Sequence, residues 1–289
     1  GLDVSATDKS SIVTVSVGVA GAGISASAVA IAVGGSVALS EIDSSVIAQI
    51  KDGSTINLRN QSDLNVRATN TTKIIAIGLG ASAAVGGASG AGAVGFAAGV
   101  NKITAQTGAI MAGNVIANGD DTGVNNIFVT ADNSANIVSV SVAAAVAATT
   151  GTVGFSGGGA GSGNYISGGT YALVQNAVVT GGDAMTVQSE SSATINTVVV
   201  GVAVAVSLSD KGAAFSVGVA IAVNETTGMS SLPSGVPAGS GFAVVSRVID
   251  SKVTLNGALR VTALSTQRIR ADVTALSAAV AGTGGFGLS

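Results

Sequence analysis

The sequence contains no histidine, cysteine or tryptophan, and these absences narrow the functions that it can carry. Without histidine or cysteine there is no Ser-His-Asp or Cys-His catalysis, no thiolate redox chemistry, no zinc site of the usual Cys/His type and no disulfide. Charged residues make up only 9% of the 289 residues and the net charge is −3, so no basic surface exists for nucleic acid. We therefore expect no enzyme activity, no cofactor and no nucleic-acid partner.

Long uncharged stretches, such as residues 74–100 and 133–182, resemble membrane spans at first sight. They are rich in glycine, serine and threonine, however, and their apolar residues alternate with a period of two instead of forming runs of about twenty large apolar residues. The sequence therefore predicts no membrane insertion. The chain begins at Gly1 and carries no signal peptide, so we expect it to be a piece of a longer protein.

Small side chains dominate what is present. Glycine alone accounts for 42 residues, and the whole chain weighs only 27.3 kDa. Valine, isoleucine and threonine alternate with alanine, glycine and serine, which is typical of strands and wrong for helices, because β-branching and glycine both lower helix propensity. The sequence therefore predicts an all-β fold in which backbones approach closely.

A five-residue pattern recurs along the whole chain, at residues 3–7, 65–69, 128–132, 186–190 and 260–264. Its fourth residues, Ala6, Ala68, Ala131, Ser189 and Ala263, are spaced by 62, 63, 58 and 74 positions. We therefore interpret residues 1–289 as one continuous array. Repeat 1 covers 7–68, repeat 2 covers 69–131, repeat 3 covers 132–189, repeat 4 covers 190–263, and 264–289 form a partial fifth repeat.

Each repeat contains an alternating strand, a short turn, a second strand and a more polar portion. In the fourth repeat, for example, the turn Ser209-Asp210-Lys211-Gly212 precedes a second strand at 215–223. Such a chain can bury itself by coiling, so that each strand pairs in parallel with its equivalent one coil later, about 4.8 Å away. The predicted fold is a β-solenoid, similar to a parallel β-helix, with repeats of about 60 residues and a core rich in glycine, alanine and valine.

The number of coils in a repeat is left open by the sequence. If a coil takes about 20 residues, each repeat forms three coils and the chain is a rod of roughly 65 to 70 Å. One broad coil per repeat is the alternative. The glycine-rich turn between the first and second strands would equally close an antiparallel hairpin.

Phenylalanine recurs near the start of each second strand, at Phe96, Phe155, Phe215 and Phe286. A row of aromatic rings could form a platform for a ligand. We favour the simpler interpretation that these rings fill an otherwise small core and stack between equivalent positions.

Asparagine follows the second strand in three repeats, at Asn101, Asn164 and Asn224. These side chains could contact a metal or a sugar. Asparagine also tolerates left-handed backbone and forms local hydrogen bonds at corners, and stacked amides set strand register. We therefore expect these residues to serve as a turn or as a stacked amide ladder.

The fourth repeat is longer by about eleven residues, and the excess maps to 225–241, which contains both prolines of the chain. Because proline cannot donate to a central ladder, we expect a loop that protrudes from the stack. Insertions in repeat proteins often carry binding, so this loop is the predicted contact surface. Its candidate contact residues are Thr226, Met229, Leu232, Pro233 and Pro237.

Few residues suggest a metal site. Asp120 and Asp121 lie in an acidic turn that could hold calcium weakly, but they lack the ligand spacing of an EF-hand. Residues 90–95 match a dinucleotide fingerprint without the helix that it requires, and residues 154–158 match a nucleophile elbow without any histidine as base. The sequence predicts no catalytic, cofactor or metal residues, with calcium as the open alternative.

The repeat units resemble the long repeat regions of giant bacterial surface adhesins, the leukotoxin-like and filamentous-haemagglutinin-like exoproteins. The segments that carry the resemblance best are 46–50, which read Val-Ile-Ala-Gln-Ile, and 64–68, which read Leu-Asn-Val-Arg-Ala. The resemblance covers essentially the whole chain. It implies a β-solenoid stalk exported to the cell surface, with binding tips and export signals elsewhere.

We therefore expect a non-enzymatic stalk or rod segment of an extracellular bacterial filamentous adhesin. Its partners would be neighbouring repeats of the same chain, identical filaments, or the surface of a host or neighbouring cell. A self-assembling extracellular fibre or sheath subunit is the second hypothesis, because an open parallel ladder has unpaired edges. A polysaccharide-active β-helix is the weakest hypothesis, since only 15 acidic residues are spread over the chain and such activity needs convergent carboxylates.

Overall fold

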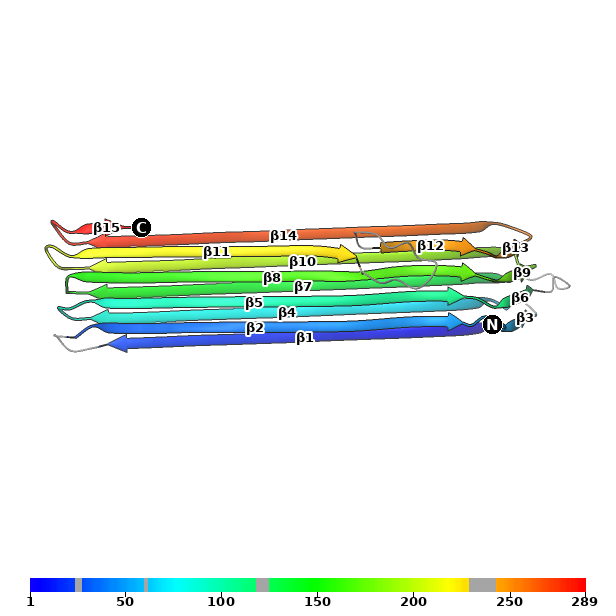
Figure 1. The fold of residues 1–289 in the computed structure, drawn as a ribbon, viewed down its shortest axis with the longest axis horizontal. Coiled ribbons are helices and arrows are strands. Elements are labelled where there is room, and N and C mark those ends of the chain that lie inside the picture. Colours follow the sequence, from blue (N-terminus) through cyan, green and yellow to red (C-terminus); the bar gives the residue numbers. More distant parts are fainter. Residues whose placement is uncertain (24–27, 60–61, 118–124, 229–242) are drawn as a thin grey trace.

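A computed structural model describes residues 1–289 except 24–27, 60–61, 118–124 and 229–242. In this described part all regular elements are strands, and there is no helix that could cross a membrane. The strands form three sheets, in which every paired strand runs parallel to its neighbour (Figure 1). The predictions of an all-β fold and of parallel stacking in sequence order are confirmed.

The chain visits the three sheets in turn. Sheet A contains β1 (Leu2–Gly23), β4 (Leu64–Gly86), β7 (Asn126–Thr149), β10 (Ala184–Ser207) and β14 (Leu259–Ala281). Sheet B contains β2 (Ala30–Ile50), β5 (Ala91–Met111), β8 (Val153–Gln175), β11 (Ala213–Gly228) and β15 (Phe286–Leu288), and β12 (Ala243–Ile249) also pairs with β8. Sheet C contains β3 (Thr55–Leu58), β6 (Asn114–Ala117), β9 (Val178–Thr180) and β13 (Lys252–Thr254).

The pairing in sheet A connects residues that are about one sequence repeat apart. Leu2 pairs with Leu64, Leu64 with Ile127, Ile127 with Met185, and Met185 with Leu259. These steps of 62, 63, 58 and 74 positions match the spacings between the recurring five-residue patterns. Between two such pairs the chain passes once through sheet A, once through sheet B and once through sheet C. The interpretation with three coils of about 20 residues is therefore wrong.

The long axis of the molecule runs along the strands. A strand of 22 residues such as β1 extends about 70 Å, whereas five strands at about 4.8 Å stack to about 20 Å. Figure 1 shows the long strands lying along the longest axis of the molecule. The prediction that stacked coils produce a rod of 65 to 70 Å is therefore wrong for this chain, which is a broad slab.

The alternative of an antiparallel hairpin at the glycine-rich turn, which the sequence left open, is excluded by the strand pairing. β1 and β2 do not pair with each other; β1 belongs to sheet A and β2 to sheet B, which lies against it. The turn at Ser209-Asp210-Lys211-Gly212 is present, with the amide of Gly212 donating to the carbonyl of Ser209 at 3.0 Å. Turns of this kind lead the chain from one face of the slab to the other.

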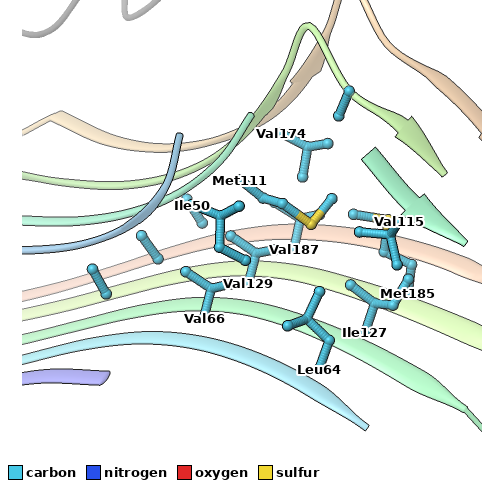
Figure 2. Close-up of a cluster of buried hydrophobic side chains, with 14 of the residues drawn as sticks. Ile50, Leu64, Val66, Met111, Val115, Ile127, Val129, Val174, Met185 and Val187 are labelled. Atoms are coloured by element: carbon cyan, nitrogen blue, oxygen red, sulfur yellow. The ribbon is translucent and has the colours of Figure 1, made fainter. Parts of the chain in front are cut away.

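The largest cluster of buried aliphatic side chains lies where all three sheets meet. Leu64 and Val66 from β4, Met111 from β5 and Val115 from β6 are all fully buried there (Figure 2). Next along the strands lie columns of isoleucine, in sheet A at 12, 74, 137 and 195 and in sheet B at 42, 103 and 166. Beyond them the interior contains mainly alanine, glycine and serine.

The decrease in side-chain size brings the two long sheets into backbone contact. A methyl group added at Gly34 of β2 would lie 1.9 Å from the carbonyl oxygen of Ala81 in β4, and one at Gly80 would lie 1.8 Å from that of Phe96. Equivalent positions at Gly95, Gly158 and Gly201 are similarly closed, at 2.0 to 2.2 Å. Glycine is therefore required at these positions, because the facing strands leave no room for a Cβ atom.

Candidate interaction surfaces

The three predicted asparagines form a hydrogen-bonded column inside the slab. Asn101 pairs with Asn164, and Asn164 pairs with Asn224, on adjacent strands of sheet B. The Nδ2 atom of each donates to the Oδ1 atom of the next, at 2.8 Å in both cases. Asn101 and Asn164 are fully buried, and all three lie within strands instead of at a corner. Stacked amides of this kind fix the register, since a shift by one residue would leave them unpaired.

Hydroxyl groups from both long sheets surround this column. Asn164 Nδ2 lies 2.9 Å from Thr197 Oγ1 and 3.0 Å from Ser162 Oγ, and Asn101 Nδ2 lies 3.2 Å from Ser139 Oγ. Asn101 and Asn164 are closed to solvent, so neither a sugar nor a metal can reach their amides from outside, whereas Asn224 at the end of the column is half-buried. The role of the network in this geometry is to satisfy buried polar groups between the sheets.

A second buried polar column was not identified from the sequence. Asp8, Asn70, Asn133 and Ser191 occupy paired inward positions in sheet A. At its open edge Ser44 and Ser10 donate hydrogen bonds of 2.7 and 2.8 Å to Asp8 Oδ2 and hold the pKa of that carboxyl below its ordinary value. Neither side-chain polar atom of Asn133 has a hydrogen-bond partner among the described residues.

The predicted phenylalanines lie on the outer face of sheet B, so the interpretation that they fill the core is wrong. Phe96 and Phe155 are each 43% exposed, and Phe286 is 59% exposed. Phe155 pairs with Phe215, and the rings of Phe215 and Phe286 lie 6.2 Å apart, but Phe96 pairs with Gly159 and stands outside that row. The interior beside these positions consists of alanine and glycine columns, which leave no space for rings.

Both outer faces of the slab are apolar over the half that lies near the glycine-rich turns. We call this part the apolar half. Val19 and Leu39 are each 75% exposed, and Ile31 is 69% exposed. In sheet A the outward residues of this half are mainly Val13, Val15, Val17, Val19, Ile75, Ile77, Leu79, Val138, Val140, Val142, Val198, Val200, Val202, Val204 and Val206. In sheet B they include Ile31, Val33, Val37, Leu39, Val94, Phe96, Val100, Val217, Val219, Ile221 and Val223.

The other half of each outer face is polar and carries one ion pair on each sheet. Arg67 lies 3.2 Å from Asp132 on sheet A, and Lys102 lies 2.9 Å from Glu41 on sheet B. The hydrogen bond from Lys102 to Glu41 raises the pKa of the lysine above its ordinary value. These pairs are exposed and link neighbouring strands, so they add little to stability. A shallow hollow on sheet A is lined by Arg67, Asp132 and Glu190, whose opposite charges are spread along the surface.

The predicted contact loop begins later than expected. Residues 225–228 belong to β11, and Thr226 donates a hydrogen bond of 2.8 Å to Gln267. Met229, Leu232, Pro233 and Pro237 lie outside the described residues. The flanking strands show where the insertion occurs: Gly228 pairs with Gly168 and Ala243 pairs with Gly169. Fourteen residues, 229–242, are therefore inserted between two adjacent positions of the ladder on β8.

Asp120 and Asp121, the calcium candidates, also lie outside the described residues. Within the described ranges no group of three or more histidine, cysteine, aspartate or glutamate residues could hold a metal ion.

Comparison of the chain with protein-family models, with curated proteins and with solved structures finds no match.

Proposed function

We propose that this chain is a non-enzymatic structural segment, a stalk or rod, of an extracellular bacterial filamentous adhesin located at the cell surface. In this proposal the fold is a β-solenoid with one coil for each repeat of about 60 residues. The observation that carries the proposal is the pairing of sheet A, in which five strands stack in sequence order. Each coil adds only another rung to the same ladder, which suits a part whose function is length and stiffness.

The distribution of polar groups also favours a structural role over chemistry. The buried amide column links three coils through side-chain hydrogen bonds of 2.8 Å and makes the stacking register specific. Apart from Asp8 at the open edge of sheet A, the described carboxylates lie on outer faces and turns, and the hollow beside Asp132 and Glu190 is open. A stalk needs register and stiffness, and this arrangement supplies both.

The cellular role can be tested by immunoelectron microscopy with antibodies raised against this chain. Intact cells of the source organism should carry label along thin surface filaments, without permeabilisation. Label found only after permeabilisation would contradict the proposed location. Label confined to the cell envelope, without filaments, would contradict the proposed stalk.

A self-assembling fibre or sheath subunit is the second candidate, and a specific observation favours it. β1 and β14 border sheet A and, in the described part of the chain, neither has a strand paired on its outer side. Unpaired edges of parallel strands are templates for further pairing. Filaments that lengthen with protein concentration, seen by electron microscopy of the purified chain, would support this role over that of a stalk segment.

A further inference from the structure

The apolar half of sheet B exposes large side chains in adjacent rows. On β11, Val217 is 53% exposed and Ile221 is 58% exposed; on β2, Val33 is 58% exposed and Leu39 is 75% exposed. These rows lie on either side of β5 and β8. Contiguous apolar patches of this kind mark interaction sites in soluble proteins.

The patch is not flat, because one row within it has no side chains. The outward positions of β8 after Phe155 are Gly157, Gly159, Gly161 and Gly163. A methyl group added at Gly159 would meet no atom within 4 Å, and one at Gly161 would meet only a carbonyl oxygen at 3.9 Å. From Gly157 to Gly161 the row is therefore a trough, with Val94 and Phe96 on one wall and Val217 and Val219 on the other. At Gly163 the ring of Tyr165 closes it, because a methyl group added there would lie 3.2 Å from that ring.

A ridge of matching length lies directly beside this trough. On β5 the outward residues Val94, Phe96 and Ala98 pair with Gly157, Gly159 and Gly161 of β8, level by level. Because ridge and trough are neighbours on one face, the face is complementary to itself. A rotation of 180° about an axis in the plane of contact, parallel to the strands and midway between β5 and β8, places each ridge over the trough of the other copy.

We propose that a second copy of this chain packs on the outer face of sheet B, with the β5 ridge of each copy in the β8 trough of the other. The rotation also places β2 of one copy over β11 of its partner, so that four strands of each chain take part. The pairing gives the exposed valines and isoleucines of both copies a dry environment. It adds lateral association to the proposed structural role, and it stands on the geometry of sheet B alone.

The area is sufficient for a stable dimer. Residues 31–39 of β2 and their partners on β5, β8 and β11 span about 30 Å along the strands and about 19 Å across four of them. Each copy therefore contributes roughly 600 Å², and the pair buries roughly 1,200 Å², which is the lower end of stable interfaces. Beyond this patch the next row contains Glu41, Lys102 and Glu225, which form a polar rim.

Two other occupants fit the observations less well. A bilayer against this face would leave β2, which borders sheet B in the described part of the chain, with unpaired backbone groups in hydrocarbon, which is unfavourable. The outer face of sheet A is also apolar, but the outward positions of β7 and β10 in this half all carry side chains, so that face has no trough.

Sedimentation equilibrium of the purified chain tests the proposal. The unsubstituted chain is expected to be a dimer at micromolar concentration. Val94→Glu, on the ridge, and Gly159→Val, in the trough, are each expected to raise the dimer dissociation constant at least tenfold. Gly159→Val is informative because a Cβ atom added at this position meets no atom of its own chain within 4 Å. Circular dichroism should show unchanged strand content for both variants.

Two matched variants provide the controls. Thr104→Glu introduces the same charge on the outer face of the same strand, but in the polar half, and should leave the dissociation constant unchanged. Val202→Glu places it in the apolar half of sheet A and should also have no effect. The proposal would be overturned if the unsubstituted chain were strictly monomeric. It would also be overturned if Val202→Glu weakened the dimer as much as Val94→Glu does. Open-ended filaments, or flotation of the chain with phosphatidylcholine vesicles, would also overturn it, in favour of edge pairing or a lipid surface.

Discussion

Two adjacent glycines of β8 should respond in opposite ways to the same substitution. Gly158 points into the interior, where an added methyl group would lie 2.0 Å from the carbonyl oxygen of Val202 and 2.6 Å from its carbonyl carbon. Gly159 points outward, and its added methyl group would meet no atom within 4 Å. The comparison therefore isolates the contact between the sheets, because strand, residue type and substitution are the same.

The size of the effect follows from these distances. An ordinary contact begins near 3.4 Å, so the sheets would have to separate locally by about 1.4 Å to accept Gly158→Ala. A gap of about 0.5 to 1 Å already removes a quarter to a half of the dispersion energy of a contact. Overpacking of a well-packed interior lowers the free energy of unfolding by about 1 to 3 kcal/mol or more. We expect Gly158→Ala to lower the free energy of unfolding by about 3 kcal/mol. Gly159→Ala should raise it by about 0.5 kcal/mol, because glycine is unfavourable within a strand.

Urea denaturation followed by circular dichroism measures both effects, at a protein concentration low enough to keep the chain monomeric. A difference of about 3 to 4 kcal/mol corresponds to melting temperatures that differ by roughly 10 °C for a chain of this size. If the two variants unfold within 1 kcal/mol of each other, the sheets are not in backbone contact at Gly158. The close approach of the two long sheets at the glycine positions would then be wrong.

Three further predictions concern the buried polar groups and the insertion. Asn164→Ala should lower the free energy of unfolding by about 2 to 4 kcal/mol, because it leaves several buried hydrogen-bond partners unpaired. Asn133→Val should leave the free energy of unfolding unchanged or raise it, because the amide of Asn133 has no hydrogen-bond partner among the described residues. Urea denaturation of the two variants measures both effects. Because the pKa of Asp8 is lowered in the folded state, this carboxylate stabilises the fold at pH values above the ordinary carboxyl pKa, and the stabilisation is lost as the pH falls through the folded-state pKa. Ser44→Ala removes the main cause of the lowered pKa, so the free energy of unfolding should depend less on pH in acid denaturation. Deleting 229–242 should leave the strand content and melting temperature nearly unchanged, because the flanking residues Gly228 and Ala243 already pair with adjacent positions of β8. A 15-residue deletion that also removes Gly228 shifts the following strand by one residue, which exchanges its inward and outward side chains and should be strongly destabilising.

Strand type and parallel pairing could be predicted from the sequence because both leave local signals. Alternating β-branched residues identify the strands, and the recurring pattern around Ala6, Ala68 and Ala131 falls on residues that pair in the structure. Identical neighbours in a parallel ladder stack like on like, so a repeated string is itself a record of the pairing. The insertion in the fourth repeat was placed in the same way, within a few residues.

Strand length could not be predicted, and for that reason the sequence leaves the number of coils in a repeat open. The polar residues Asp8, Lys9 and Ser10 interrupt the apolar alternation, and in isolation they resemble a turn between two short strands. In the structure β1 runs through them without a break. Asp8 points inward and accepts hydrogen bonds from Ser44 and Ser10, which satisfies a polar group that would otherwise end the strand. That compensation comes from the facing sheet, and no local pattern reveals it.

The orientation of each alternating segment was the other property hidden from the sequence. In residues 137–142, hydrophobicity alone would turn the valines inward and the serines outward, yet Ser139 and Ser141 are buried at 1% exposure and the valines face out. The alternation cannot change within an unbroken strand, so it is determined ten residues earlier, where Ile127 and Val129 enter the core. Small inward residues then allow the sheets to close on the glycine columns. As a consequence, valine side chains that are normally buried on folding remain on the outer faces of the slab. The stability of the slab and its association with another surface therefore have to be considered together.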